Sequence, residues 1–303
     1  MTLQQFEIFV QVVKAGSFTK AGAMLSLTQS AVSHIISAFE AELGFTLLYR
    51  NRSGISLTNE GQKIYQHALD ILGKVELIKQ EAAAIAGVES GILNIGCFPS
   101  FAAKKLPDII VHFQEKYPKI ELKIFEGSYY EIEEWVSTGV IDIGFSAINP
   151  GHLDFIPLWE DELVVIVQQN HPFSAKETVC IDEISEQPFI MPKSGCDVLL
   201  KQIFKEHNVQ PNITFEFEDT RTIVSMVDRG LGISIVPEMA VDLPPPRLRI
   251  IRLLPNSPRT IGVVLKSQQA ASPAAAAFIR EVEQLVEYNV WRTTKSGLGA
   301  RLH

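Results

Sequence analysis

The sequence lacks any apolar run that approaches the roughly 18 residues needed for a membrane-spanning helix. Residues 1–13 also lack the basic-then-apolar order that is typical of a secretory signal. We therefore expect a cytoplasmic protein with no membrane partner. A hydrophobic fraction of 46% and a charged fraction of 20% are ordinary for a globular protein, and 303 residues suffice for two or three domains.

Cysteine is scarce. Cys97, Cys180 and Cys196 show no CxxC spacing and are odd in number, which argues against a disulfide framework. The simplest interpretation of each thiol is a small buried hydrophobic residue. Cys196, beside Gly195, is the best placed of the three to act as a redox sensor, and that alternative stays open.

Catalytic and cofactor motifs are missing as well. We find no HExxH, GxSxG or GxxxxGK[ST] pattern and no zinc-ligand spacing, and the seven histidines are scattered without an i, i+4 pair. The sequence therefore favours a protein that is not an enzyme and that holds no metal and no cofactor.

Acidic charge dominates, but unevenly. The net charge is -8, whereas residues 1–65 hold five basic and four acidic side chains, which leaves -9 for the remainder. A near-neutral N-terminal module can still bind DNA if its cations are well placed, so this balance is compatible with a nucleic-acid partner without predicting one.

Three short helices are predicted before residue 44. Apolar residues at helical spacing mark the first helix: Leu3, Phe6, Phe9, Val10 and Val13. Gly16 ends it, Ser17 can cap a second helix over 18–25, and Thr28 can cap a third over 29–43.

Two helices joined by a short turn, with another packed across them, form a helix-turn-helix, whose second helix enters the DNA major groove. Amide and hydroxyl side chains suit base edges and phosphates. The candidates at the start of the third helix are Thr28, Gln29, Ser30, Ser33 and His34. On spacing alone, a generic three-helix bundle with a polar surface remains the alternative.

Two apolar stretches, 45–49 and 55–58, flank Gly54 and predict a small hairpin. Beside a helix-turn-helix such a hairpin is a wing, and Arg50 and Arg52 would lie where phosphates or a minor groove pass. The alternative is two solvated arginines on a loop.

The first 61 residues carry a longer pattern without a gap. It comprises Phe9, Gly16–Thr19, Ala21, Leu25, Thr28–Ser33, Ile36, Glu40, Glu42–Gly44, Leu47–Leu48, Arg50, Leu57–Thr58 and Gly61. This pattern resembles the LysR-type transcriptional regulators. The resemblance implies a winged helix-turn-helix, a homodimer or homotetramer, and a ligand-regulated promoter. His34 stands where that family commonly has arginine, so affinity for DNA should depend on Lys20, Arg50 and Arg52.

A long helix is predicted from residue 59. Its apolar residues step by 4 and 3 in an a/d heptad pattern: Ile64, Ala68, Ile71, Val75, Ile78, Ala82 and Ile85. So regular a stripe favours self-association, with Ile64, Ile71, Val75 and Ile78 as dimer contacts, and the family resemblance implies antiparallel pairing. A helix that lies on its own domain is the alternative.

After Gly91 strands and helices alternate, which predicts an α/β fold with a mostly parallel sheet. The expected strands are 92–97, 120–126, 141–146, 162–168, 189–191, 213–217, 233–236 and 260–265, and the expected helices are 101–117, 128–138, 197–208, 220–229 and 273–288. Two such sets suggest two lobes with a ligand cleft between them. The family resemblance implies a fold like that of periplasmic binding proteins.

Hydroxyl side chains follow several of these strands near helix starts, where free N–H groups favour anions. The candidate effector contacts are Ser100, Phe101, Ser128, Ser146 and Thr220. Ser100, Ser128 and Thr220 also match positions that the resemblance assigns to effector binding. A small carboxylate or amino acid is the expected ligand. Simple helix capping is the alternative for each hydroxyl.

The predicted domains are a winged helix-turn-helix over 1–58, a linker helix over 59–88, an effector domain over 91–290 and a disordered tail over 291–303. Lobe I would comprise 91–162 and 266–290, and lobe II 163–265. We expect a sequence-specific regulator that binds double-stranded DNA under control of a small effector. A small-ligand-binding protein without a DNA role is the rival, but it leaves the first 90 residues unexplained.

Overall fold

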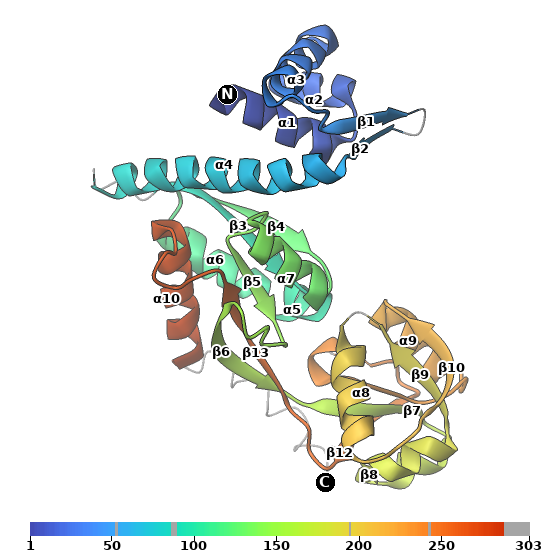
Figure 1. Cartoon of the computed structure of the whole chain (residues 1–303). Helices are drawn as coiled ribbons and strands as arrows, with labels where there is room; N and C mark the ends of the chain where they lie inside the picture. Colours follow the sequence, from blue (N-terminus) through green and yellow to red (C-terminus); the bar gives the residue numbers. More distant parts are fainter. Residues whose placement is uncertain (52–53, 86–89, 194, 242–243, 288–303) are drawn as a thin grey trace. The chain divides into compact units, whose positions relative to one another are not determined.

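A computed structural model describes residues 1–51, 54–85, 90–193, 195–241 and 244–287. The chain forms two compact units, the first comprising 1–91 with 138–140 and the second the remainder (Figure 1). The predicted tail 291–303 and the last residues of the predicted linker helix, 86–88, lie outside the described residues. Within the described part, no helix is long and apolar enough to cross a membrane.

The first unit contains the three predicted short helices, a hairpin and one long helix. They are α1 (Leu3–Ala15), α2 (Phe18–Leu25), α3 (Gln29–Leu43), β1 (Leu48–Asn51), β2 (Gly54–Leu57) and α4 (Asn59–Ile85). The side chains of Ser17 and Thr28 accept from the backbone N–H groups of Lys20 and Ala31, so the expected caps are present. Gly16 adopts the left-handed conformation that ends α1.

Aromatic edge-to-face contacts join α1, α3 and α4. The ring of Phe39 lies 5.3 Å from that of Phe6 and 5.9 Å from that of Phe9, and Phe9 also lies 6.0 Å from Tyr65. Each such pair contributes about 0.5–1.5 kcal/mol beyond its buried area. Ala68 of α4 is fully buried in the same core, so the start of the long helix belongs to the winged domain.

The first lobe of the second unit contains a five-stranded sheet in the order β4-β3-β5-β13-β6. Its strands are β3 (Gly91–Cys97), β4 (Ile120–Glu126), β5 (Ile143–Ser146), β6 (Asp154–Asp161) and β13 (Arg259–Leu265), and its helices are α5 (Pro99–Lys104), α6 (Leu106–Lys116), α7 (Tyr129–Thr138) and α10 (Pro273–Glu287). The expected single helix over 101–117 is wrong. The chain forms two helices interrupted at Lys105, because Pro107 has no backbone N–H to donate and is tolerated in the first turn of α6 but not inside one continuous helix.

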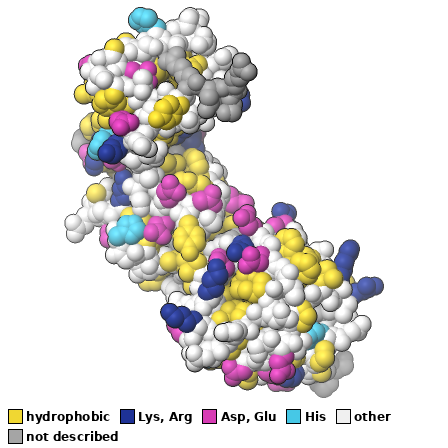
Figure 2. Space-filling view, turned by 45° about the vertical axis from the view of Figure 1, so that its right-hand side comes forward, with side chains coloured by type: hydrophobic (Ala, Val, Ile, Leu, Met, Phe, Trp, Pro, Cys, Tyr) yellow, Lys and Arg dark blue, Asp and Glu magenta, His cyan; other side chains and the backbone are white. Residues whose placement is uncertain are grey.

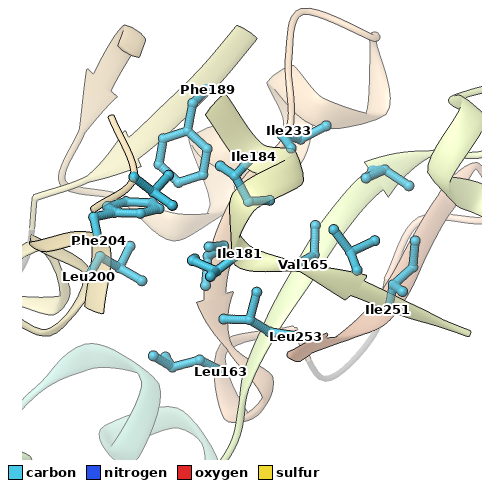
Figure 3. Packing of buried hydrophobic residues seen from close by; sticks show 14 of the residues in the cluster. Leu163, Val165, Ile181, Ile184, Phe189, Leu200, Phe204, Ile233, Ile251 and Leu253 are labelled. Carbon is cyan, nitrogen blue, oxygen red and sulfur yellow. The ribbon is translucent and has the colours of Figure 1, made fainter. Parts of the chain in front are cut away.

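The second lobe has a four-stranded sheet in the order β11-β7-β12-β8 and a β10-β9 pair. Its elements are β7 (Leu163–Gln168), η1 (Pro172–Ala175), β8 (Thr178–Cys180), η2 (Ile181–Glu186), β9 (Pro188–Pro192), α8 (Cys196–Glu206), β10 (Asn212–Phe217), α9 (Thr220–Asp228), β11 (Ser234–Pro237), η3 (Glu238–Ala240) and β12 (Leu248–Leu254), where η denotes a 3-10 helix. Buried side chains from β7, β12 and α8, including Leu163, Leu200 and Leu253, fill its core (Figure 3).

Two expectations for this unit are corrected by the strand pairing. The sheets are mixed rather than mostly parallel, because β13 runs antiparallel to both β5 and β6, and β11 and β12 run antiparallel to β7. The segment 259–265 therefore belongs to the first lobe, not to the second. The chain crosses between the lobes at Glu162 and again between Leu254 and Arg259 (Figure 1).

A buried carboxylate ties α10 to α6. Glu281 is 5% exposed, lies 2.9 Å from His112 Nε2 and accepts from Lys116 Nζ. Burial raises the pKa of Glu281. The hydrogen bonds from Lys116 and His112 together lower it by more than burial raises it, so the pKa lies below its ordinary value. The ionised form of Glu281 thus stabilises the first lobe.

We expect Glu281→Gln to lower the free energy of unfolding by about 1–3 kcal/mol at neutral pH, because charged hydrogen bonds are lost from a buried site. Glu281 has a lowered folded-state pKa, so its contribution is present above its ordinary value of 4.5 and is lost as pH falls through the folded value. Urea denaturation at pH 7 and pH 4 measures both effects. Glu287→Gln, an exposed site on the same helix, is the control. An equal loss at both pH values would contradict the assignment.

Candidate functional site

The start of α3 presents polar side chains to solvent. Thr28, Gln29, Ser30 and His34 are exposed and Ser33 is half-buried. Thr28 Oγ1 lies 3.0 Å from Ser30 Oγ, in addition to capping the helix. The opposite face of α3 is anchored in the core by fully buried residues: Val32, Ile36 and Phe39. The structure therefore brings all five predicted residues of α3 together at one helix end.

The turn between α2 and α3 is held by close backbone contacts. Leu27 N–H donates to Gly22 O at 2.9 Å, and Ser26 adopts the left-handed conformation with φ 56°. A Cβ placed on Gly22 would lie 2.7 Å from Leu27 O, closer than real Cβ atoms approach a backbone oxygen. Gly22 thus lets the turn pack on α2 and sets the position of the start of α3.

The predicted cations fall on two elements. Lys20 is exposed in the first turn of α2. Arg50 lies on β1, where its backbone pairs with Ile55 of β2, so the predicted hairpin is present. The Arg50 side chain and all of Arg52 lie outside the described residues. On the face shown in Figure 2, acidic and basic side chains are intermixed rather than segregated.

The junction of the two lobes contains a buried cation. Arg259 opens β13 and is 3% exposed, and its Nε and Nη2 atoms lie 2.8 and 2.7 Å from Asp161 Oδ2. Asp161 closes β6 and pairs with Arg259 in the sheet register, and its other oxygen accepts from Met239 N–H of η3 at 3.1 Å. The ion pair therefore sits where the chain crosses between the lobes.

The same guanidinium reaches two helix starts. Arg259 Nη1 donates to the hydroxyl of Tyr129 at the start of α7, and Nη2 lies 3.3 Å from Ser100 Oγ in α5. Burial raises the pKa of Tyr129, so its phenol stays protonated at neutral pH. The second lobe touches this ring at Gly195, where a Cβ would lie 2.6 Å from Tyr129 Cδ2. Only glycine fits there, with φ +94°.

Of the five predicted effector contacts, only Ser100 lies in this cluster. Ser128 Oγ donates to Glu131 Oε2 at 2.8 Å and starts α7 as a capping residue. Ser146 is 2% exposed and accepts from Ile148 N–H. Thr220 is half-buried at the first position of α9, whose cap is Asp219.

Phe101, another of the five, lies in the core of the first lobe. It is fully buried and stacks on Phe145 at 4.1 Å within the first lobe. Sequence analysis missed Arg259, Asp161 and Tyr129. Arg259 stands at the start of the apolar segment 259–265, which is a local signal that could have marked it. No such signal marks Asp161, and the contact between the two depends on strand pairing across about 100 residues of sequence.

Two of the three thiols, Cys97 and Cys196, are buried. Burial raises the pKa of the Cys196 thiol to about 11, and that of Cys97 to about 12, so both stay protonated at neutral pH. Cys180 is exposed. Across the described ranges, no group of three His, Cys, Asp or Glu side chains could hold a metal ion.

Nearly the whole chain matches models of known protein families. Residues 3–62 match the model of the bacterial regulatory helix-turn-helix protein, lysR family, and residues 86–287 match the LysR substrate binding domain. The chain is 35% identical over 288 residues to the uncharacterized HTH-type transcriptional regulator YvbU of Bacillus subtilis, covering 94% of this chain and 99% of that protein.

Two further similarities concern a curated relative and a solved structure. The transcriptional activator protein LysR of Escherichia coli is 27% identical over 283 residues, which covers 92% of this chain and 91% of that protein. Full-length CbnR, solved in complex with its target DNA, superposes with a TM-score of 0.68 at 22% identity, covering 94% of this chain and 99% of CbnR. At that identity the structure supports the fold alone.

The tight turn yields a prediction. Gly22→Ala should lower the stability of the first unit by about 1–3 kcal/mol, because the new Cβ overpacks against Leu27 O and cannot move without shifting the turn. Gly73→Ala, on α4 with open space around its Cβ, is the matched control and should be neutral or stabilising by up to about 1 kcal/mol. Urea denaturation followed by circular dichroism measures both. Equal behaviour of the two variants would show that the turn can yield.

Proposed function

The chain belongs to the LysR family of bacterial helix-turn-helix regulators, and from this premise we propose that α3 reads operator DNA under control of a small carboxylate or amino acid held between the two lobes. The family membership makes it a DNA-binding transcriptional regulator with an effector-binding domain. The observation that carries the finer proposal is the convergence of exposed polar side chains at the start of α3, opposite a fully buried face.

Base reading is proposed for the first turns of α3. Gln29 and His34 are exposed there, and amide and imidazole groups can pair with base edges in the major groove. The hydroxyls of Thr28, Ser30 and Ser33 suit phosphates and adaptable base contacts. Lys20, Arg50 and Arg52 supply the cations that the nearly uncharged recognition helix lacks, so they should carry the electrostatic part of the affinity.

Self-association is proposed through the second half of α4. Ile64 and Ala68, at the start of the predicted stripe, pack within the winged domain and support the alternative that the helix covers its own domain. Further along, Ile71 and Ile78 are 36% and 64% exposed. Apolar residues exposed in line on a long helix favour a partner helix. The dimer would place two reading helices on a two-fold symmetric operator, and pairs of dimers would form the tetramer.

Effector control is proposed to act through the lobe junction. Ser100 lies in the Arg259 cluster, which contacts both crossovers, so a ligand bound beside it would bias how the lobes close. Ser128 and Thr220 lie at helix starts and remain candidate contacts. A redox signal through Cys196 is less well supported, because the thiol is buried and its pKa is raised to about 11.

Changing the proposed DNA contacts should separate two kinds of effect. The DNA used is a duplex selected from a random library by the wild-type chain. We expect Gln29→Ala to weaken the free energy of binding to it by roughly 1–3 kcal/mol and to relax sequence preference, as the loss of a base contact does. Lys20→Ala should weaken binding to all sequences and reduce the slope of log affinity against log salt by about one. Lys74→Ala, an exposed lysine on α4, is the control. An unchanged salt slope for Lys20→Ala would remove it from the interface.

The proposed helix pairing can be tested by one substitution. Ile78→Gln should weaken self-association of the full chain at least about tenfold, because an apolar contact of the proposed seam is replaced by a polar group. Sedimentation equilibrium measures the dissociation constant. Lys63→Gln, an exposed position on the same helix that does not flank the predicted stripe, should leave it unchanged. If both variants self-associate like the wild type, α4 is not the interface.

A further inference from the structure

Two hydroxyl groups at the lobe junction accept hydrogen bonds from one guanidinium. Arg259 Nη2 lies 3.3 Å from Ser100 Oγ, and Arg259 Nη1 donates to the Tyr129 hydroxyl. Arginine can only donate, so both hydroxyl oxygens act as acceptors and their own hydrogens remain to be donated. Within the described part of the chain, neither hydroxyl has another hydrogen-bonding partner. The junction thus holds two O–H donors without acceptors.

The chemistry of these donors favours an anion. A cation that donates to a hydroxyl oxygen polarises the O–H bond and strengthens it as a donor, since hydrogen bonds in a chain reinforce one another. Arg259 itself is already engaged by Asp161, Tyr129 and Ser100. It therefore acts on a ligand through the two hydroxyls, as a positioning residue. A carboxylate, which accepts on two oxygens, is the group that two such donors suit.

A carboxylate oxygen on the second lobe is an acceptor without a donor. Asp197, the second residue of α8, is 8% exposed, and its Oδ2 accepts from Lys201 Nζ at 2.7 Å. Its Oδ1 atom is buried and has no hydrogen-bond partner. A buried, unpartnered acceptor on a charged group destabilises the protein until a donor meets it. This oxygen is suited to an ammonium group.

Donors and acceptor belong to the same junction. Gly195, two residues before Asp197, packs on the ring of Tyr129. The charges of Arg259, Asp197 and Asp161 all act on the pKa of the intervening Cys196 thiol, which places these three groups near it. The two hydroxyl donors come from α5 and α7 of the first lobe, and the acceptor comes from α8 of the second. A ligand that meets both sides would therefore bridge the lobes.

We propose that the lobe junction binds a zwitterionic α-amino acid, with its carboxylate on the hydroxyls of Ser100 and Tyr129 and its ammonium on Asp197 Oδ1. This inference rests on the proposed function and narrows the effector from small carboxylates in general to α-amino acids. A simple carboxylate leaves Asp197 Oδ1 without a donor, and a simple amine leaves the hydroxyls of Ser100 and Tyr129 without an acceptor. Tyr129 and Asp197 are buried in this structure, so the lobes must separate to admit the ligand.

The test uses the full chain and a thermal-shift screen of the proteinogenic α-amino acids. We expect at least one to raise the melting temperature with concentration. For that compound, calorimetry should show that the matching acid without the amino group and the matching amine without the carboxylate each bind roughly tenfold to hundredfold more weakly.

Three variants separate recognition from folding. Asp197→Asn should lower affinity for the amino acid about tenfold or more and reduce its advantage over the acid that lacks the amino group. Lys201→Gln removes the same ion pair but keeps the carboxylate, so it should preserve that advantage. Asp228→Asn changes another aspartate with an unpartnered buried oxygen, at the last residue of α9, and should also preserve it.

The inference is overturned if no amino acid shifts the melting temperature, if the acid without the amino group binds equally well, or if Asp197→Asn leaves the discrimination intact. The proposed function would be contradicted by two other results. These are an absence of binding to any duplex selected from a random library, or DNA binding that no class of small molecule alters. If another compound controls DNA binding while amino acids do not, the ligand class alone is wrong.

Discussion

The buried ion pair between Arg259 and Asp161 joins the two strands along which the chain passes between its lobes. Removing one partner of such a pair leaves an uncompensated buried charge, which costs about 3–5 kcal/mol. The pair also fixes Tyr129 and Ser100 through the guanidinium and reaches η3 of the second lobe through Asp161. Five elements of the effector domain, namely β6, β13, α5, α7 and η3, therefore depend on one charged contact. Any ligand that binds beside it acts where both crossovers can respond.

The N-terminal unit is the part that local sequence defines best. Its helix starts and ends follow from Thr28, Ser17 and Gly16, which cap or terminate helices through contacts a few residues away. The five polar residues of α3 were correctly expected to gather at one helix end, because they lie within two turns of the same helix. Short-range chemistry of this kind is readable from a sequence without knowledge of the rest of the fold.

The effector domain was less predictable because its organisation depends on distant pairing. The edge strand β6 contains Pro157 and lacks a clear alternation of buried residues, so nothing local marked it as a strand. Without β6, the return of β13 to the first lobe could not be seen, and the lobe boundary was misplaced. The Arg259 cluster was missed for the same reason.

The geometry of the long helix α4 limits which mutations this linker can accept during evolution. Its first turns are fused into the winged core through Ala68, while Ile71 and Ile78 farther along remain exposed. Its 27 residues make a rod of about 40 Å in which every inserted residue adds about 1.5 Å and rotates the rest of the helix by about 100°. If the far half pairs with a second copy, the length of the helix sets both the distance and the rotation between the paired segment and the winged domain. Point substitutions along α4 can then accumulate, but an insertion or deletion would rotate α3 away from the DNA. The sequence of such a linker should therefore vary more readily than its length.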